Sequence, residues 1–100
     1  MRYKTRPGVV LASVCGQDLL VAAEAARAFC PAVTEINETS AFLWQRLVGG
    51  ATGEELEAAV VQEYEVDDLA LVRGAIRDFL DQMINLNYLL SDEQGGPHEE

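Results

Sequence analysis

Metal-binding and redox motifs are missing from this sequence of 100 residues. It has one histidine, His98, and two cysteines, Cys15 and Cys30. The cysteines lack C-x-x-C spacing and His98 follows Gly95-Gly96-Pro97 near the end, so no zinc-ligand pattern is present. We therefore expect no metal and no cofactor, and we expect both cysteines to be reduced, at least partly buried small hydrophobic residues.

Basic residues are scarce. Seven Lys and Arg stand against 17 Asp and Glu, which gives a formal net charge of −10. Duplex binding depends on Lys and Arg releasing counterions from phosphates, so this charge argues against a nucleic-acid partner. Many of the acids fall in two segments: Glu54, Glu55, Glu57, Glu63 and Glu65, and then Asp92, Glu93, Glu99 and Glu100.

Long hydrophobic runs are also missing. Arg2, Lys4 and Arg6 precede the apolar run 9–14, which superficially resembles a secretory signal. The run is short and stops at Gly16-Gln17-Asp18 without a cleavage site, so we reject a signal. No stretch approaches the roughly 20 apolar residues of a membrane span. We expect a cytoplasmic protein with no membrane contact.

Catalytic constellations are not found either. Thr39 and Ser40 lie beside Glu38, but no histidine or lysine base accompanies them, which leaves helix capping as their role. There is no glycine-rich phosphate loop. An enzyme is the least favoured class.

Strand patterns dominate the first third of the chain. Two apolar runs, 8–14 and 18–23, flank Cys15-Gly16-Gln17, which predicts a β-hairpin. Residues 22–28 are rich in alanine and are interpreted as the fraying end of the hairpin and a loop closed by Pro31. Residues 32–36 are predicted to form the third strand of an antiparallel sheet.

Three helices are predicted after this sheet. Asn37 caps the first, over 38–48, whose apolar face carries the core residue Trp44. Thr52 and Glu55 form a capping box for the second helix. Asp67 is predicted to cap the third and longest helix, which ends at 85–87 and is followed by a short extended piece at 88–90.

The third helix carries two side-chain stripes. One is a regular apolar repeat that predicts burial: Leu69, Val72, Ile76, Phe79, Met83 and Leu86. A neighbouring stripe mixes arginine with apolar residues, whereas a helix that buries one face is mostly charged there. We take this second stripe as a candidate binding surface: Ala70, Arg73, Arg77, Leu80 and Ile84.

The elements make one α+β domain, an N-terminal three-stranded antiparallel sheet followed by three helices in a winged-helix-like arrangement. It spans residues 1–90, and 91–100 is an acidic tail that we expect to be disordered.

The order and spacing of these motifs resemble the PqqD-like family, named for pyrroloquinoline quinone synthesis. The resemblance covers nearly the whole chain up to Leu90. One departure is Asn87, where the family more often has glycine. The motifs that carry it are Ile36-Asn37-Glu38-Thr39, Ala41-Phe42-Leu43-Trp44-Gln45-Arg46-Leu47, Gly50-Ala51-Thr52-Gly53-Glu54-Glu55-Leu56, Tyr64-Glu65-Val66-Asp67, Phe79-Leu80 and Asn87-Tyr88-Leu89-Leu90.

The resemblance implies a precursor-peptide recognition element. Such proteins hold the leader segment of a ribosomally made peptide and present it to a modifying enzyme, often a radical S-adenosylmethionine protein. In the family the leader adds beside the third strand and packs against the third helix. An unpaired strand edge can satisfy the backbone groups of a disordered peptide, so this mode is also reasonable on physical grounds.

The candidate peptide-binding residues follow from this mode. Leu80 and Ile84 would floor a groove, and Arg73 and Arg77 would meet acidic leader side chains. The alternative for the arginines is local ion pairing with Asp78 and Asp81. The full set is Ala32, Val33, Thr34, Glu35, Ile36, Ala70, Arg73, Arg77, Leu80 and Ile84.

Two other functions stay open on the sequence. One is a winged-helix DNA-binding regulator, for which only Arg73 and Arg77 supply basic side chains on the third helix. The other is a subunit that docks on a modifying enzyme without meeting a peptide. An exposed strand edge can pair with a second copy, so we expect a monomer or a weak dimer.

Overall fold

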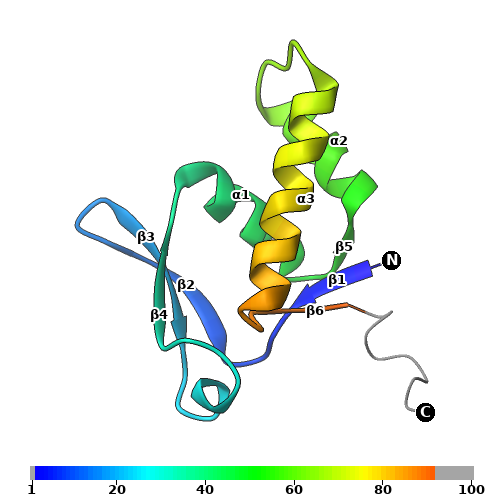
Figure 1. Cartoon of the computed structure of the whole chain (residues 1–100). Helices are drawn as coiled ribbons and strands as arrows, with labels where there is room; N and C mark the ends of the chain where they lie inside the picture. The colour runs from blue at the N-terminus through cyan, green and yellow to red at the C-terminus, as the bar shows by residue number, and fades with distance from the viewer. Residues whose placement is uncertain (1, 92–100) are drawn as a thin grey trace, which may run out of the picture.

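The computed structural model describes residues 2–91 and consists of two small sheets and three helices (Figure 1). The predicted α+β class, three antiparallel strands followed by three helices, is confirmed. The elements in chain order are β1 (Arg2–Thr5), β2 (Val9–Val14), β3 (Gln17–Ala22), the 3-10 turn η1 (Ala26–Ala28), β4 (Val33–Ile36), α1 (Glu38–Leu47), β5 (Ala51–Thr52), α2 (Gly53–Glu63), α3 (Leu69–Asn85) and β6 (Leu89–Ser91).

The first sheet has the strand order β2–β3–β4, with both pairs antiparallel. Its hairpin turns at Cys15 and Gly16, whose φ angles of 52° and 79° fit a two-residue type I′ turn. The prediction that both cysteines are at least partly buried is wrong for Cys15, because this turn exposes it at the tip. Cys30 is buried, as expected.

The alanine-rich segment after the hairpin is more ordered than a fraying strand. It forms η1, and Ala26 and Cys30 of this region join the hydrophobic core. The chain then returns to the sheet, where the amide of Ala22 donates to the carbonyl of Ala32 at 2.9 Å just before β4 begins.

The helix caps follow the sequence with one exception. The side chain of Asn37 accepts from the amide of Ser40 at 2.8 Å, and Thr52 and Glu55 form the predicted capping box. The cap of α3 is Asp68, whose carboxylate accepts from the amide of Ala70, and not Asp67 as predicted. The two neighbouring aspartates are chemically equivalent as caps, so only the path of the chain selects between them.

A second sheet, absent from our predictions, has the order β5–β1–β6. It joins both ends of the described chain to its middle: Tyr3 pairs with Ala51 of β5 and with Ser91 of β6. Ser91 was predicted to begin the tail, and the structure has it as the last residue of β6. The remainder of that segment, including His98, lies outside the described residues.

The core lies between the two sheets and the helices. Trp44 is 1% exposed, as predicted, and its ring meets that of Tyr88 edge to face, with 6.3 Å between centroids. Buried residues of β3, α1, α2, α3 and β6 complete the cluster, among them Leu20, Leu47, Leu56, Met83 and Leu89. None of the helices in the described chain is long and apolar enough to span a membrane.

Candidate functional site

Strand β4 offers an unpaired edge. Among the described residues it pairs with β3 alone, in a register that sets Val33 opposite Val21 and Ile36 opposite Asp18. Thr34 and Ile36 are half-buried toward the core, while Val33 and Glu35 are exposed. The backbone groups on the far side of β4 are therefore available to an added strand.

Tyr88 makes two hydrogen bonds to β4 and to the segment just before it. Its hydroxyl donates to the carbonyl of Pro31 at 2.8 Å and lies 2.6 Å from the hydroxyl of Thr34, from which it accepts. The side chain is fully buried, and burial raises the pKa of the Tyr88 hydroxyl above its ordinary value, with the Thr34 hydrogen bond opposing the shift. The neutral hydroxyl therefore links β4 to the turn that follows α3.

Asn87 extends this link. It has a φ of 67°, and the amides of Asn87 and Tyr88 donate back to the carbonyls of Ile84 and Met83, which is a Schellman ending of α3. Its side-chain amide donates to the carbonyl of Phe29 at 2.8 Å. A glycine could adopt the same φ but could not make this bond, so the departure from the family pattern adds a tether to the segment before β4.

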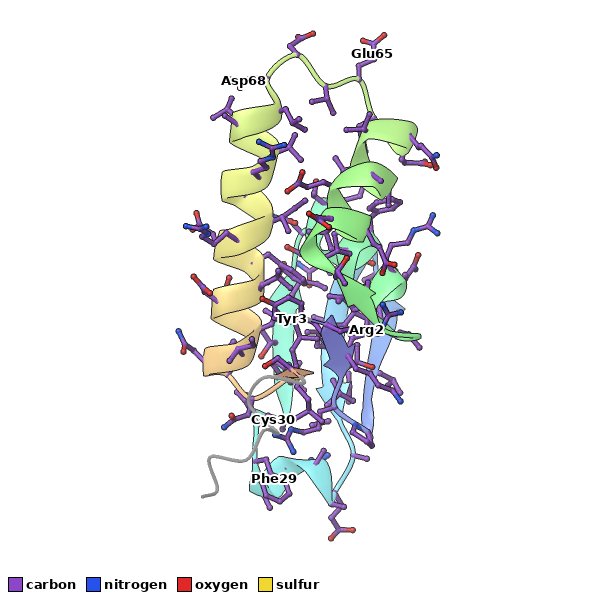
Figure 2. The ribbon with its side chains drawn as sticks, turned by 90° about the vertical axis from the view of Figure 1, so that its right-hand side faces the viewer. Arg2, Tyr3, Phe29, Cys30, Glu65 and Asp68 are labelled. Carbon is purple, nitrogen blue, oxygen red and sulfur yellow. The ribbon has the colours of Figure 1, made fainter. Side chains whose placement is uncertain are left out.

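The predicted α3 stripe lies on the side of the helix that faces α2. The guanidinium of Arg73 forms an ion pair with Glu57 of α2, with 3.0 Å between Nε and Oε1. Arg77 and Leu80 line an open cavity of about 480 Å³ together with Tyr3 and Gly53. Figure 2 views this side of the molecule, where Arg2 and Tyr3 of β1 are labelled.

The remaining residues of the stripe complete this picture. Ala70 is exposed, Leu80 is 5% exposed and belongs to the core, and Ile84 is half-buried one helical turn beyond Leu80. Arg73 and Arg77 are both exposed, and neither forms an ion pair with Asp78 or Asp81. The stripe therefore forms the face of α3 that lies toward α2.

The structure does not bring the two parts of the predicted site together. Figure 1 shows β4 and α2 on opposite sides of α3, so the β4 edge and Arg73 do not share a groove. Residues of a helix are spaced by about 100°, so the flank opposite the stripe carries residues two positions away from it. This opposite flank carries Ala75, Phe79, Gln82 and Leu86, none of which is in the predicted peptide-binding set.

No signal in the sequence could have chosen between the two flanks. On the opposite flank Phe79 is buried and Leu86 half-buried, whereas Ala75 and Gln82 are exposed. This flank therefore combines buried apolar and exposed residues, as the stripe does. Which of the two flanks faces β4 depends on how α3 is oriented over the sheet. Within residues 2–91, no group of three or more His, Cys, Asp or Glu side chains is placed to hold a metal ion.

Comparison with known proteins places the fold. The family model described as coenzyme PQQ synthesis protein D (PqqD) matches residues 19–89. The solved structure of TbiB1 in complex with the TbiA(beta) leader peptide is 26% identical, with a TM-score of 0.68 over 86% of this chain and 93% of that chain. Lasso peptide synthetase B1 complexed with the leader peptide is 19% identical, with a TM-score of 0.68 over 89% of this chain and 98% of that chain, and supports the fold alone. No curated protein matches the chain.

Proposed function

This chain belongs to the PqqD family, and from that premise we propose that it binds the leader segment of a ribosomally synthesised precursor peptide and presents it to a modifying enzyme. The protein itself would perform no catalysis. Its contribution would be to hold a disordered peptide in an extended form that an enzyme can recognise.

The observation that carries this proposal is the unpaired edge of β4 in a chain similar to TbiB1, whose structure contains a leader peptide. Residues 32–36 would pair with the leader through backbone hydrogen bonds, which tolerate many sequences. The short length of β4 limits pairing between two copies, because few backbone groups are offered. The hydrogen bonds from Tyr88 would hold this edge in place before the peptide arrives.

Specificity would come from side chains beside the added strand. Alternate leader side chains point toward the protein, because successive residues of a strand face opposite sides. We propose that they meet the flank of α3 that carries Phe79 and Leu86. Arg73 and Arg77 lie on the other side of the helix and would not touch a leader held at β4.

The finer features of the proposal follow the family. We propose a winged-helix-like monomer or weak dimer that works in the cytoplasm with a radical S-adenosylmethionine enzyme. A DNA-binding role is not retained, since one of the two arginines that it would need is engaged by Glu57 and the net charge is −10.

An amide-resolved NMR titration tests the proposal. The probe is the leader half of the short peptide encoded beside this gene, and the control is the same peptide with its sequence scrambled. We expect shifts concentrated in residues 32–37 and 75–86. Shifts confined to Tyr3, Gly53 and residues 70–77 would move the binding site to the α2 side, and no shift at high peptide excess would refute leader binding.

A further inference from the structure

The outer face of the β2–β3–β4 sheet is apolar and uncovered. Side chains that point inward include Val9, Leu20 and Ala22, which are buried. The alternate residues point outward and form two rows across the three strands: Val10, Val21 and Val33 in one, and Ala12, Leu19 and Glu35 in the other, with Val14 beside them. We call these seven residues the outer face.

The exposure of this face is unusual for a strand surface. Val10 is 58% exposed, Val14 50% and Val33 56%. An antiparallel sheet with one solvated side normally alternates apolar inward and polar outward residues. Figure 1 shows the three helices on the other side of this sheet, so no described element shields the outer face. Contiguous exposed apolar patches of this kind mark interaction sites.

The size of the face limits what it can do alone. The strands β2 and β3 are six residues long and β4 is four residues long. At about 3.3 Å per residue and about 4.8 Å between strands, they present roughly 250 Å². A stable interface buries about 800 Å² per partner. The outer face can therefore form the apolar centre of an interface, and the surrounding surface must supply a polar rim.

Charge identifies the kind of partner. The ionisable residues within β2, β3 and β4 are Asp18, which lies on the inner side of the sheet with Leu20, and Glu35, which is exposed on the outer face. A second copy seated on this face would bring together the Glu35 carboxylate of each copy and two chains that each have a formal net charge of −10. Like charges across an interface oppose association, whereas a basic rim on a partner favours it. The occupant is thus a different protein.

We propose that the outer face docks the peptide-modifying enzyme through a surface that is apolar at its centre and basic at its rim. This inference rests on the proposed function. The leader would occupy the edge of β4 while the enzyme covers the adjoining face, so both would be held on one small sheet. Val10 and Val14 lie on β2, separated from the leader edge by β3, and can be changed without touching it.

The test uses the full chain with the purified modifying enzyme and precursor encoded beside its gene. The variant is Val10→Asp with Val14→Asp, and the matched control is Val61→Asp, a valine of α2 that is 48% exposed. Two quantities are measured for each protein: the Kd for the fluorescently labelled leader and the Kd for the enzyme. Circular dichroism checks folding, and Val10→Thr with Val14→Thr, which keeps the shape of valine, replaces the double aspartate if that variant unfolds.

We expect the aspartate variant to bind the enzyme at least tenfold more weakly, or the threonine variant about threefold, with the leader Kd unchanged within twofold and the control normal in both assays. Unchanged enzyme affinity would overturn the docking proposal, as would a parallel loss of leader affinity in a folded variant. Sedimentation that shows a wild-type dimer dissociated by the variant would assign the face to a second copy instead. A wild-type protein that binds the enzyme but no leader would refute the proposed function and leave the face as a docking surface.

Discussion

The two sheets of this molecule have the same number of strands but different origins. The sheet β2–β3–β4 is built from residues 9–36 through a two-residue turn and one short excursion. The sheet β5–β1–β6 joins residues 2–5, 51–52 and 89–91, which are far apart in the sequence. The local sheet leaves one apolar face uncovered beside the β4 edge, whereas the non-local sheet joins the start, the middle and the end of the described chain. We infer that the first serves binding and the second stability.

The largest expected effect is on the free energy of unfolding, and it should differ between two neighbouring leucines of the sheet β5–β1–β6. Leu89 is 1% exposed and Leu90 is 37% exposed. Leu89→Ala should lower the free energy of unfolding by about 2–4 kcal/mol, because it leaves a cavity in the core, and Leu90→Ala by less than about 1 kcal/mol. Urea denaturation measures both. Equal losses would mean that β6 does not close the core.

The next effect concerns the hydroxyl that ties the two regions together. Tyr88→Phe leaves the carbonyl of Pro31 and the hydroxyl of Thr34 without their buried partner, which should cost about 1–3 kcal/mol. Leader affinity should also fall several-fold, because β4 loses its anchor. Tyr64→Phe, at a residue that is 39% exposed, serves as the control and should change neither quantity. A stable Tyr88→Phe protein with normal affinity would show that β4 holds its position without this bond.

A smaller, stabilising effect is expected in the local sheet. Cys15 has a positive φ in the hairpin turn, and asparagine before glycine is the preferred pair for a type I′ turn. Cys15→Asn should raise the free energy of unfolding by about 0.5 kcal/mol in thermal or urea unfolding. Gly16→Ala, at a φ of 79° with open space around it, should lower it by about 1 kcal/mol through backbone strain alone. A destabilised Cys15→Asn protein would contradict the turn assignment.

The smallest effect is expected on the α2 side of α3. The Arg73 side chain is 61% exposed, so Arg73→Ala should cost less than about 0.5 kcal/mol, since an exposed ion pair contributes little. Leader affinity, measured by titration of the fluorescently labelled leader as for Tyr88→Phe and Tyr64→Phe, should stay within twofold. A loss greater than fivefold would place the leader beside Arg73 and restore the groove that the sequence suggested.

Local signals in the sequence predicted most of the fold. Asn37 and the Thr52–Glu55 box mark two helix starts correctly, because a cap acts on amides two or three residues away. The hairpin at residues 15–16 follows from the same short range. The sheet β5–β1–β6 was missed since its strands are two to four residues long and pair across the whole chain.

The two parts of the candidate site rest on different signals in the sequence. Residues 32–36 stand out because a short β-branched run leads directly into a helix cap, and the structure gives them a free edge. The α3 residues were chosen because their stripe mixes apolar residues with Arg73 and Arg77. The opposite flank, which carries Phe79 and Gln82, also mixes apolar and polar residues. The helical repeat determines which residues share each flank of α3, but it does not determine which flank faces β4.

By itself, the sequence determined the helices, the hairpin, the acidic surface and the family, since caps, turns, charges and periodic apolar residues act over a few neighbours along the chain. Only the tertiary structure decided that Tyr88 holds β4 in place, that Arg73 turns to Glu57, and that the outer face of the first sheet stays uncovered. These depend on contacts between residues that are distant in the chain, and such contacts are set by packing around the core.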